Sequence, residues 1–238
     1  YFNRRLIRLG VPVHLGRRVT ADELADGGYG EIVYSAGVVP RIPEIEGIDH
    51  PSVIAYDDLL DGTRTAGDKV AVIGAGGIGV DVAQFLIREP NQTLEEWKAS
   101  WGVVDPDEVP GGVGKPVPEK SLREVHLLQR KTSRIGAGLG KTTGWVHRAE
   151  LKKHGVHQYT GVTYDRIDDD GLHVTIDGTP RTIAVDNVIV CTGQESDRSA
   201  VGDAADNVHV IGGADVAAEL DAKRAIRQAV ELAAELSR

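Results

Sequence analysis

The stretch that decides the fold is "KVAVIGAGGIGVDVAQFLIRE", Lys69–Glu89. Its apolar run predicts a buried strand, and the apolar spacing after the glycines predicts a helix. Gly74, Gly76 and Gly79 form G-x-G-x-x-G between them. The first glycine permits a tight turn, the second lets the backbone approach a pyrophosphate, and the third lets helix and strand pack closely. With Gly77 at the expected helix N-terminus, where free N–H groups favour anions, the stretch predicts a dinucleotide-binding turn.

The next predicted strand, "LREVHLLQRK", indicates which dinucleotide is bound. An NAD site normally carries Asp or Glu at the end of this strand, to bind the ribose 2′-hydroxyl. Here the strand ends in Gln129, Arg130 and Lys131, with Arg134 just beyond. These cations suit a 2′-phosphate, so we expect NADPH rather than NADH. The gap from the glycines is about 50 residues instead of about 20, which we attribute to a polar insertion at 90–120. The alternative is a solvated strand end.

The segment "RIGAGLGKTTGWVHR", Arg134–Arg148, resembles a phosphate-binding P-loop at first sight. The pattern G-x-x-x-x-G-K-[S/T] built on Lys141 would require glycine where Ile135 stands, and no strand leads directly into it. A nucleotide hydrolase is therefore disfavoured. We expect a flexible loop beside the NADPH site, with Lys141 able to approach the cofactor.

Three further strands are each expected to end in a glycine turn. They contain Ala36 and Gly37 in "IVYSAG", Gly193 in "VIVCTG", and Gly213 and Asp215 in "VHVIGGADVA". Taken singly, each could be only a strand-ending turn. The last is expected to run directly into a long helix from Val216.

Strands alternate with helices along the chain, which indicates an α/β fold with parallel sheets. Short strands with Asp-Gly turns between about 162 and 193 predict a β-meander. At the N-terminus we expect a helix ended by Gly10, a strand at 11–16 ("VPVHLG") and a capping box from Thr20 to Glu23.

The order of these motifs resembles the two-dinucleotide-binding flavoprotein superfamily. The stretches "VAVIGAGGIGVDVA", "LLQRKTSRIGAGLGKTTGWVHR", "YDRIDDDGLHVTIDG" and "VIGGADVAAELDAKRAI" together resemble the C-terminal half of the bacterial NADPH-dependent 2,4-dienoyl-CoA reductases. The resemblance implies a Rossmann-like NADPH-binding domain at 40–198, inserted into a partial FAD-binding domain at 1–39 and 199–238. It implies that the motifs holding Ala36, Gly37, Gly193, Gly213 and Asp215 serve FAD.

The resemblance also implies a function in the β-oxidation of unsaturated fatty acids. NADPH would pass hydride to FAD, and electrons would continue through a 4Fe-4S cluster to FMN in an N-terminal barrel that reduces the dienoyl-CoA. Because the sequence contains no methionine, we expect it to be a fragment without that barrel. We assign no catalytic residue here and expect the fragment alone to be inactive on dienoyl-CoA. The alternatives are a 2-enoate reductase, an amine dehydrogenase such as trimethylamine dehydrogenase, or a non-catalytic nucleotide-binding module.

Composition excludes several other classes. With a net charge of -9 and dispersed basic residues, we expect no nucleic-acid partner. No apolar run approaches the roughly 20 residues of a membrane span, and one cysteine, Cys191, excludes an internal disulfide or a CxxC pair. The lone cysteine and acidic balance favour the cytoplasm. We assign no metal ligands. His154 and His157 are expected to face solvent, and Asp168–Asp170 is interpreted as a solvated turn.

Overall fold

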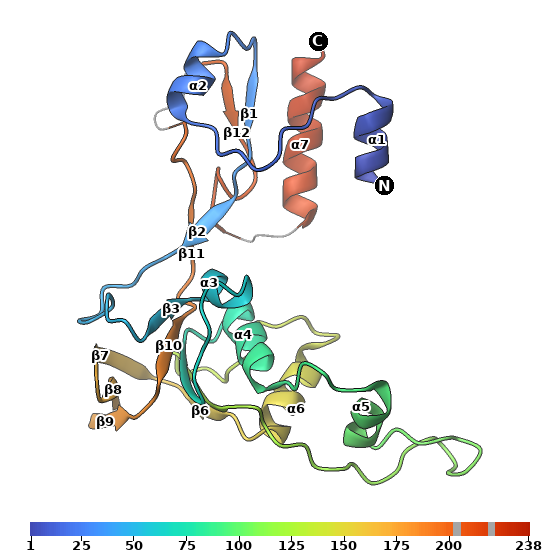
Figure 1. Cartoon of the computed structure of the whole chain (residues 1–238), viewed down its shortest axis with the longest axis vertical. Helices are drawn as coiled ribbons and strands as arrows, with labels where there is room; N and C mark the ends of the chain where they lie inside the picture. The colour runs from blue at the N-terminus through green and yellow to red at the C-terminus, as the bar shows by residue number, and fades with distance from the viewer. Residues whose placement is uncertain (202–205, 219–221) are drawn as a thin grey trace. The chain divides into compact units, whose positions relative to one another are not determined.

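The computed structural model describes residues 1–201, 206–218 and 222–238. The chain divides into two compact units (Figure 1). Unit 1 comprises Tyr1–Val39 and Glu195–Arg238, and unit 2 comprises Pro40–Gln194.

Unit 2 is an α/β unit with two sheets. Its elements are β3 (Val53–Ala55), α3 (Tyr56–Leu60), β4 (Lys69–Ile73), α4 (Gly77–Ile87), α5 (Leu94–Trp101), β5 (Glu124–Leu128), α6 (Gly144–Lys153), β6 (His157–Tyr159), β7 (Val162–Asp168), β8 (Gly171–Ile176), β9 (Thr179–Ile183) and β10 (Asn187–Val190).

The larger sheet of unit 2 is parallel, with strand order β3-β10-β4-β5-β6. Strand β4 lies at its centre, and four consecutive residues, Val70–Ile73, are fully buried. Such a continuous apolar run is typical of a parallel strand covered on both faces. The quoted stretch therefore forms the predicted strand, turn and helix.

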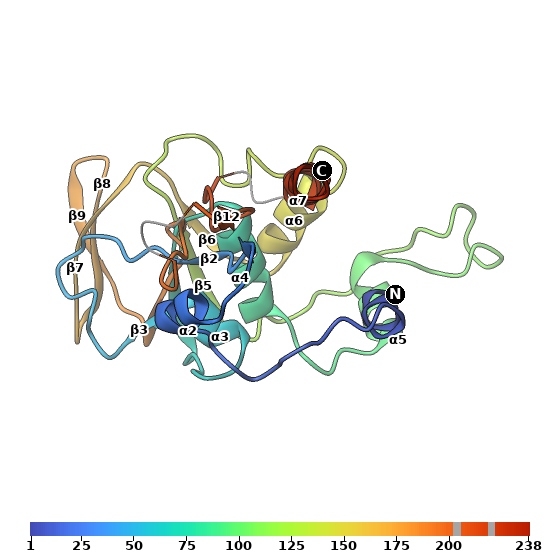
Figure 2. The same ribbon diagram turned by 90° about the horizontal axis from the view of Figure 1, so that it is seen from above.

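The two faces of the parallel sheet are covered by different layers. Val70 and Val72 pack with apolar side chains of α4 and α6, such as Leu86 and Leu151. Ala71 and its neighbours on the other face pack against the antiparallel sheet β7-β8-β9. Figures 1 and 2 both show this three-stranded sheet on the side of the parallel strands opposite to α4 and α6. The predicted α/β class, Rossmann-like core and β-meander are thus confirmed.

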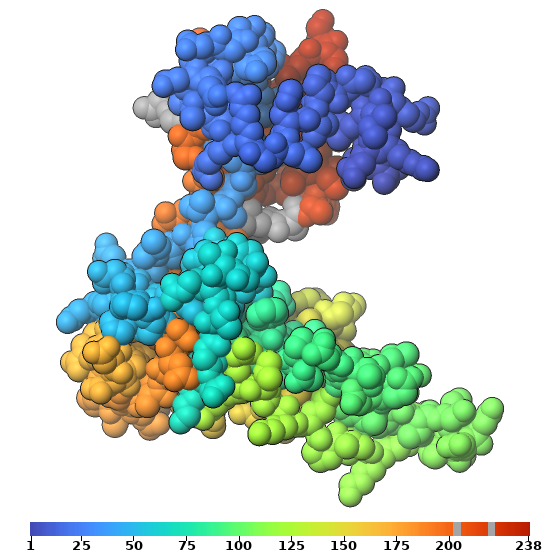
Figure 3. Space-filling model, in the orientation of Figure 1, coloured from blue at the N-terminus to red at the C-terminus, as the bar shows by residue number. Residues whose placement is uncertain are grey.

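The insertion at 90–120 carries one helix, α5. Thr93 and Glu96 form a capping box, since each side chain bonds the backbone N–H of the other residue. Gly102 ends the helix in a left-handed conformation. The green segment of Figure 3, which includes this insertion, extends away from the body of unit 2.

Unit 1 is smaller and buries less. Its elements are α1 (Phe2–Arg8), α2 (Ala21–Asp26), β1 (Ile32–Tyr34), β12 (Val208–Val210) and α7 (Ala222–Leu236). Strands β1 and β12 pair in parallel, with Ile32 opposite Val208. Strands β2 (Val38–Pro40) and β11 (Gln194–Ser196), which pair with each other, contain the residues where the chain passes from one unit to the other.

Local predictions for unit 1 had mixed outcomes. The N-terminal helix ends before Gly10, and the capping box of Thr20 and Glu23 is present, as predicted. The strand predicted at 11–16 is wrong: this segment is irregular, and Val11, Val13 and Leu15 are exposed. Alternating apolar residues need a partner strand, and none pairs with them among the described residues. No helix in the described part of the chain is long and apolar enough to cross a membrane.

Candidate functional site

The glycine turn after β4 has the geometry of a phosphate cradle. Gly74 adopts φ +98°, and a Cβ placed on it would lie 2.3 Å from the carbonyl oxygen of Cys191. A Cβ on Gly79 would lie 1.8 Å from the carbonyl oxygen of Gly74. By contrast, a Cβ on Gly76 or Gly77 would meet nothing within 4 Å. Gly74 and Gly79 thus hold helix and strand together, while Gly76 and Gly77 face open space.

Helix α4 begins at that open space without a side-chain cap. Gly76 is its N-cap residue, and no side chain bonds the first-turn N–H groups. The first N–H groups of a helix have no partner within the helix, so they are available to an anion. Gly76 and Gly77 can therefore hold a pyrophosphate group.

The turn opens into a cavity of about 460 Å³ that lies within unit 2. This volume falls in the range of small-molecule and cofactor sites. The cavity is lined by the glycine turn at 74–78, the end of β5 at 129–131, the loop at 133–138, the segment at 191–193, Arg41 and Tyr164. It lies beyond the carboxyl ends of β4, β5 and β10, where parallel sheets bind their ligands.

The charges of the cavity are all of one sign. Arg41, Arg130, Lys131 and Arg134 line it, and its lining contains no Asp or Glu. A carboxylate that could bind a ribose 2′-hydroxyl is therefore missing from the lining, and cations that could bind a phosphate are present.

The structure brings most of the predicted cofactor residues of unit 2 into this one cavity. Those lining it are Gly74, Gly76, Gly77, Arg130, Lys131, Arg134 and Gly193. Gly79 packs behind the turn. Lys141 does not line the cavity, so its approach to the cofactor stays a prediction.

The loop before α6 is attached to the core. Ile135 is 1% exposed and belongs to the cluster around α4. Arg148 donates to the carbonyl oxygen of Gly136 at 3.0 Å. The residue that breaks the P-loop pattern thus anchors the loop, while Gly136–Gly138 line the cavity.

The sequence reasoning missed several lining residues, among them Gln129, Arg41 and Tyr164. Gln129 is buried and donates through Nε2 to the carbonyl oxygens of Lys131 and Ser133, which shapes the loop. Arg41 donates to the carbonyl oxygen of Thr192. Both side chains serve backbone groups, and no motif signals them.

Tyr164 is the third of these missed residues. It lies on β7, where the register against β8 shifts between Tyr164 and Arg166. Such a bulge can re-aim a side chain. The Tyr164 hydroxyl is buried without a well-formed hydrogen bond, and burial raises its pKa above the usual value, opposed by the nearby Gly74 backbone and Arg130. A buried polar group without a partner at a binding cavity is costly unless a ligand supplies one. The Asp-Gly turns of the sequence predicted the β-meander, but no sequence pattern predicted this bulge.

Cys191, the one cysteine of the sequence, also lines the cavity. It is buried at 7% exposure, and this burial raises the pKa of its thiol to about 12. A reactive cysteine needs an accessible thiolate. Cys191 is therefore a packing residue under the glycine turn.

The remaining predicted residues lie together in unit 1. Ala36 and Gly37 follow β1, and Gly213 and Asp215 follow the paired strand β12. A Cβ on Gly213 would lie 3.2 Å from the Cα atom of Gly37, so the two turns are in close contact. Where two glycine turns meet at the carboxyl ends of paired parallel strands, the protein backbone can approach a ligand closely.

Asp215 already has partners of its own. Gln228 donates to its carboxylate at 2.9 Å, and Arg198 lies 3.6 Å from it. The helix predicted directly after this turn, from Val216, is wrong: Val216 is irregular and the described helix α7 begins at Ala222. The turn occupies Gly212–Asp215, and residues 216–218 after it are irregular.

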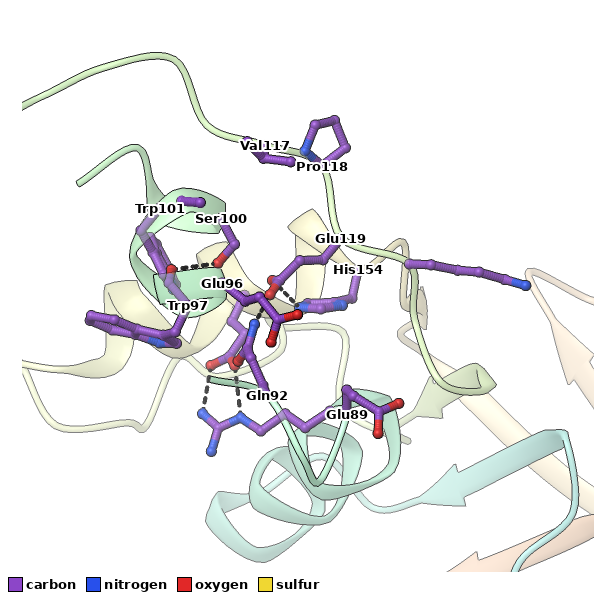
Figure 4. A pocket seen from close by; sticks show the side chains of 14 residues that line it. Glu89, Gln92, Glu96, Trp97, Ser100, Trp101, Val117, Pro118, Glu119 and His154 are labelled. Atoms are coloured by element: carbon purple, nitrogen blue, oxygen red, sulfur yellow. Dashed lines mark hydrogen bonds and ion pairs between the residues drawn. The ribbon is translucent and has the colours of Figure 1, made fainter. Parts of the chain in front are cut away.

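A second cavity, of about 360 Å³, lies between the insertion and the ends of α4 and α6 (Figure 4). Its lining includes Arg88, at the C-terminus of α4, and His154, at the C-terminus of α6. In alternating strand–helix units the helix C-termini lie at the amino ends of the strands, opposite to the edge where cofactors bind. This cavity is therefore not the dinucleotide site.

Figure 4 also corrects the expectation for His154. Its side chain is 7% exposed, and its Nε2 atom lies 3.4 Å from the carboxylate of Glu119. Lys153 binds the same carboxylate at 2.5 Å. The insertion folds back over the end of α6 and covers His154, which the spacing of residues in α6 could not reveal. His157 is half-exposed, as predicted.

The comparisons with known proteins agree with this architecture. A family described as pyridine nucleotide-disulphide oxidoreductase matches residues 8–224. Among curated proteins, a metal reductase of Desulforamulus reducens is 25% identical over 192 residues, which cover 79% of this chain and 28% of that protein. A cinnamate reductase of Clostridium sporogenes is 32% identical over 78 residues, which cover 33% of this chain and 11% of that protein.

Among solved structures, a 2-naphthoyl-CoA reductase in complex with 2-naphthoyl-CoA is similar, with a TM-score of 0.71 and 26% identity. The match covers 95% of this chain and 30% of that one. A 6-hydroxypseudooxynicotine amine oxidase from Pseudomonas geniculata shares the fold, with a TM-score of 0.64 and 18% identity, over 92% of this chain and 31% of that one. The chain spans less than a third of the length of these relatives.

Proposed function

Since this chain belongs to the pyridine nucleotide-disulphide oxidoreductase family, we propose that it is the electron-input portion of an NADPH-dependent 2,4-dienoyl-CoA reductase. Proteins of the family are flavoprotein oxidoreductases that bind FAD and NAD(P)H. The assignment as an NADPH-dependent 2,4-dienoyl-CoA reductase rests on the cavity of unit 2 and on the motif resemblance.

The single observation that carries the NADPH assignment is the lining of that cavity. It combines an open glycine cradle at Gly76 and Gly77 with four cations and no carboxylate. A 2′-phosphate carries charge that Arg and Lys can bind, whereas NADH offers only a 2′-hydroxyl. The combination favours NADPH.

Each group of residues has a distinct task in this proposal. The N–H groups at the start of α4 hold the pyrophosphate, and Arg130 and Lys131 hold the 2′-phosphate at the end of β5. Gln129 fixes the loop that carries these cations. NADPH supplies the hydride when bound, and the residues of this chain bind it, orient it and keep water from it.

The FAD side of the proposal rests on unit 1. The contacting turns at Ala36–Gly37 and Gly213–Asp215 would hold part of FAD. Gly193, which the resemblance assigns to FAD, lines the cavity of unit 2. Among the described residues, Ala214 is the one apolar side chain of unit 1 that is buried, while Phe2, Ile226 and Val230 are exposed. Unit 1 thus buries few apolar side chains of its own among the described residues.

The substrate part of the proposal rests on the motif resemblance and on the names of two relatives. The relatives include a reductase named for 2-naphthoyl-CoA and one named for cinnamate. A conjugated acyl thioester fits the first, and a free conjugated acid fits the second. We place a 4Fe-4S cluster outside this chain, because one cysteine cannot supply four thiolate ligands. The motif resemblance implies the same for FMN. A 2-enoate reductase is the second candidate, favoured by the cinnamate reductase match.

Titration of the chain with NADPH and, separately, with NADH tests the cofactor assignment. We expect NADPH to bind at least tenfold more tightly. Equal affinities would refute the 2′-phosphate interpretation, and no binding of either would refute the assignment of the cavity. For the substrate, the whole protein is assayed for NADPH oxidation with a 2,4-dienoyl-CoA and with cinnamate. Turnover of cinnamate alone would favour the second candidate.

A further inference from the structure

Three side chains with metal-binding atoms converge on the parallel sheet of unit 2, away from the glycine turn. Glu124 and His126 lie two residues apart on β5, so they project from the same face of the sheet. His157 lies directly opposite His126 on β6. Their ligand atoms all lie within 4.8 Å of one another. The sequence separates His157 from the other two by a helix, and the strand pairing brings it back.

The distances within this cluster are short. The Nε2 atom of His126 lies 3.1 Å from Oε1 of Glu124, and the Nε2 atom of His157 lies 3.9 Å from the same oxygen. The two imidazole rings are stacked, with centroids 4.6 Å apart and 17° between their planes. In a tetrahedral zinc site with bonds of about 2.0–2.2 Å, ligand atoms stand roughly 3.4 Å apart. A metal ion binds an imidazole nitrogen in the plane of the ring, so the half-exposed His157 ring has to turn out of the stack with His126 to share the ion.

A second contact orients the more buried histidine. The hydroxyl of Tyr159 lies 3.3 Å from Nδ1 of His126. Histidine ligands commonly bond through their second ring nitrogen to such a partner, which fixes the ring and leaves the other nitrogen to the metal. His126 is 9% exposed, so this arrangement is held by packing as well.

We propose that Glu124, His126 and His157 bind a late first-row transition-metal dication, such as Zn²⁺ or Ni²⁺. Two imidazoles and one carboxylate suit these ions, and water completes the coordination. The ion ties β6, which lies at the edge of the sheet, to β5. Binding therefore stabilises unit 2, because the folded state alone brings the three ligands together.

The other cluster of this kind among the described residues provides a matched control. It comprises Asp168, Asp170 and His173. There the side chain of Arg166 lies 2.9 Å from the Asp168 carboxylate, and His173 lies 2.7 Å from it. Lys69 approaches the Glu124 carboxylate only to 4.0 Å, whereas Arg166 lies 2.9 Å from that of Asp168. The Asp168 carboxylate is therefore more fully neutralised, and this cluster has less need of a metal ion.

The test is calorimetric titration of the tag-free chain with ZnCl₂ and with NiCl₂ in a weakly coordinating buffer. We expect one site per chain. His157→Gln is expected to weaken metal binding at least tenfold, and Glu124→Gln is expected to weaken it several-fold. Tyr159→Phe is expected to weaken it about tenfold, because the hydroxyl that orients His126 is lost. His173→Gln is expected to leave the dissociation constant unchanged. Absence of binding to the wild-type chain, or an affinity insensitive to His157→Gln, would overturn the proposal, as would an equal loss in His173→Gln.

Thermal unfolding supplies a second readout. Trp97, Trp101 and Trp145 all lie in unit 2, so tryptophan fluorescence follows the unit that holds the site. Saturating Zn²⁺ is expected to raise the midpoint of unfolding of the wild type and of His173→Gln, but not of His157→Gln. A rise of equal size in all three chains would show that the ion acts elsewhere. Neither metal experiment contains NADPH, so failure of the metal proposal would leave the NADPH proposal intact.

Discussion

The substitution Gly79→Ala tests whether the glycine turn works as the structure indicates. The added Cβ would lie 1.8 Å from the carbonyl oxygen of Gly74 and 2.9 Å from its carbonyl carbon. Carbon–oxygen contacts normally stay near 3.3 Å, so helix and strand would have to separate by about 1.5 Å. Both partners are backbone atoms, so no flexible side chain can move aside.

The magnitude follows from two opposing effects. Overpacking of this kind costs about 1–3 kcal/mol, and here we take the upper end. Alanine is favoured over glycine within a helix by about 1 kcal/mol. The net loss in the free energy of unfolding is therefore about 2 kcal/mol, which for a unit of this size lowers the unfolding midpoint by about 4–8 °C.

Gly76→Ala is the matched control. Gly76 has φ −75° and ψ −165°, which alanine adopts readily, and the new Cβ would meet nothing within 4 Å. We expect its stability to stay within about 0.5 kcal/mol of the wild type. Its methyl group would occupy the space through which the pyrophosphate approaches, so NADPH should bind at least tenfold more weakly.

Unfolding followed by tryptophan fluorescence measures stability, and calorimetric titration measures the dissociation constant for NADPH. The expected pattern is a less stable Gly79→Ala and a stable Gly76→Ala that binds poorly. Equal stability of the two variants would refute the packing argument. Undiminished NADPH binding by Gly76→Ala would show that the cofactor does not approach the backbone there.

Three further predictions concern the same cavity. Arg130→Ala should weaken NADPH binding by roughly 10- to 100-fold and NADH binding little, since a charge-assisted hydrogen bond contributes about 1.5–3 kcal/mol; Lys141→Ala, outside the cavity lining, should have the smaller effect in the same titration. Cys191 should resist iodoacetamide at pH 8, because a thiol with a pKa of about 12 is ionised in about one molecule in ten thousand; rapid labelling of the folded chain, read by intact mass, would contradict its burial, and labelling in urea is the control. Tyr164→Phe should retain the midpoint of thermal unfolding and change the dissociation constant for NADPH several-fold; an unchanged constant would show that the buried hydroxyl does not serve the cofactor.

Much of the fold could be predicted from local sequence. The apolar run before Gly74 and the helical spacing after Gly79 predicted β4 and α4, because a strand buried on both faces needs an unbroken apolar run. The strand at 11–16 was predicted on the same local evidence and is absent. Alternation shows that a segment is able to form a strand, whereas forming one depends on a partner strand from elsewhere in the chain.

The cofactor residues of unit 2 could be predicted to the extent that they adjoin strand ends. Gly76 and Arg130 both follow strands of one parallel sheet, and the carboxyl ends of such strands meet at one edge. Tyr164 and Arg41 come to the same cavity from a bulge and from a connecting segment, whose directions no local pattern specifies.

The sequence by itself determined the strand–turn–helix unit, the order of the dinucleotide motifs and the cations at the end of β5. Each of these depends on residues close together in the chain, where backbone sterics and apolar periodicity act directly. Only the tertiary structure decided that His126 and His157 meet and that the insertion covers His154. These contacts join residues far apart in the chain. They depend on how close-packed layers of helices and strands fit together, and the spacing of residues along the chain does not specify that fit.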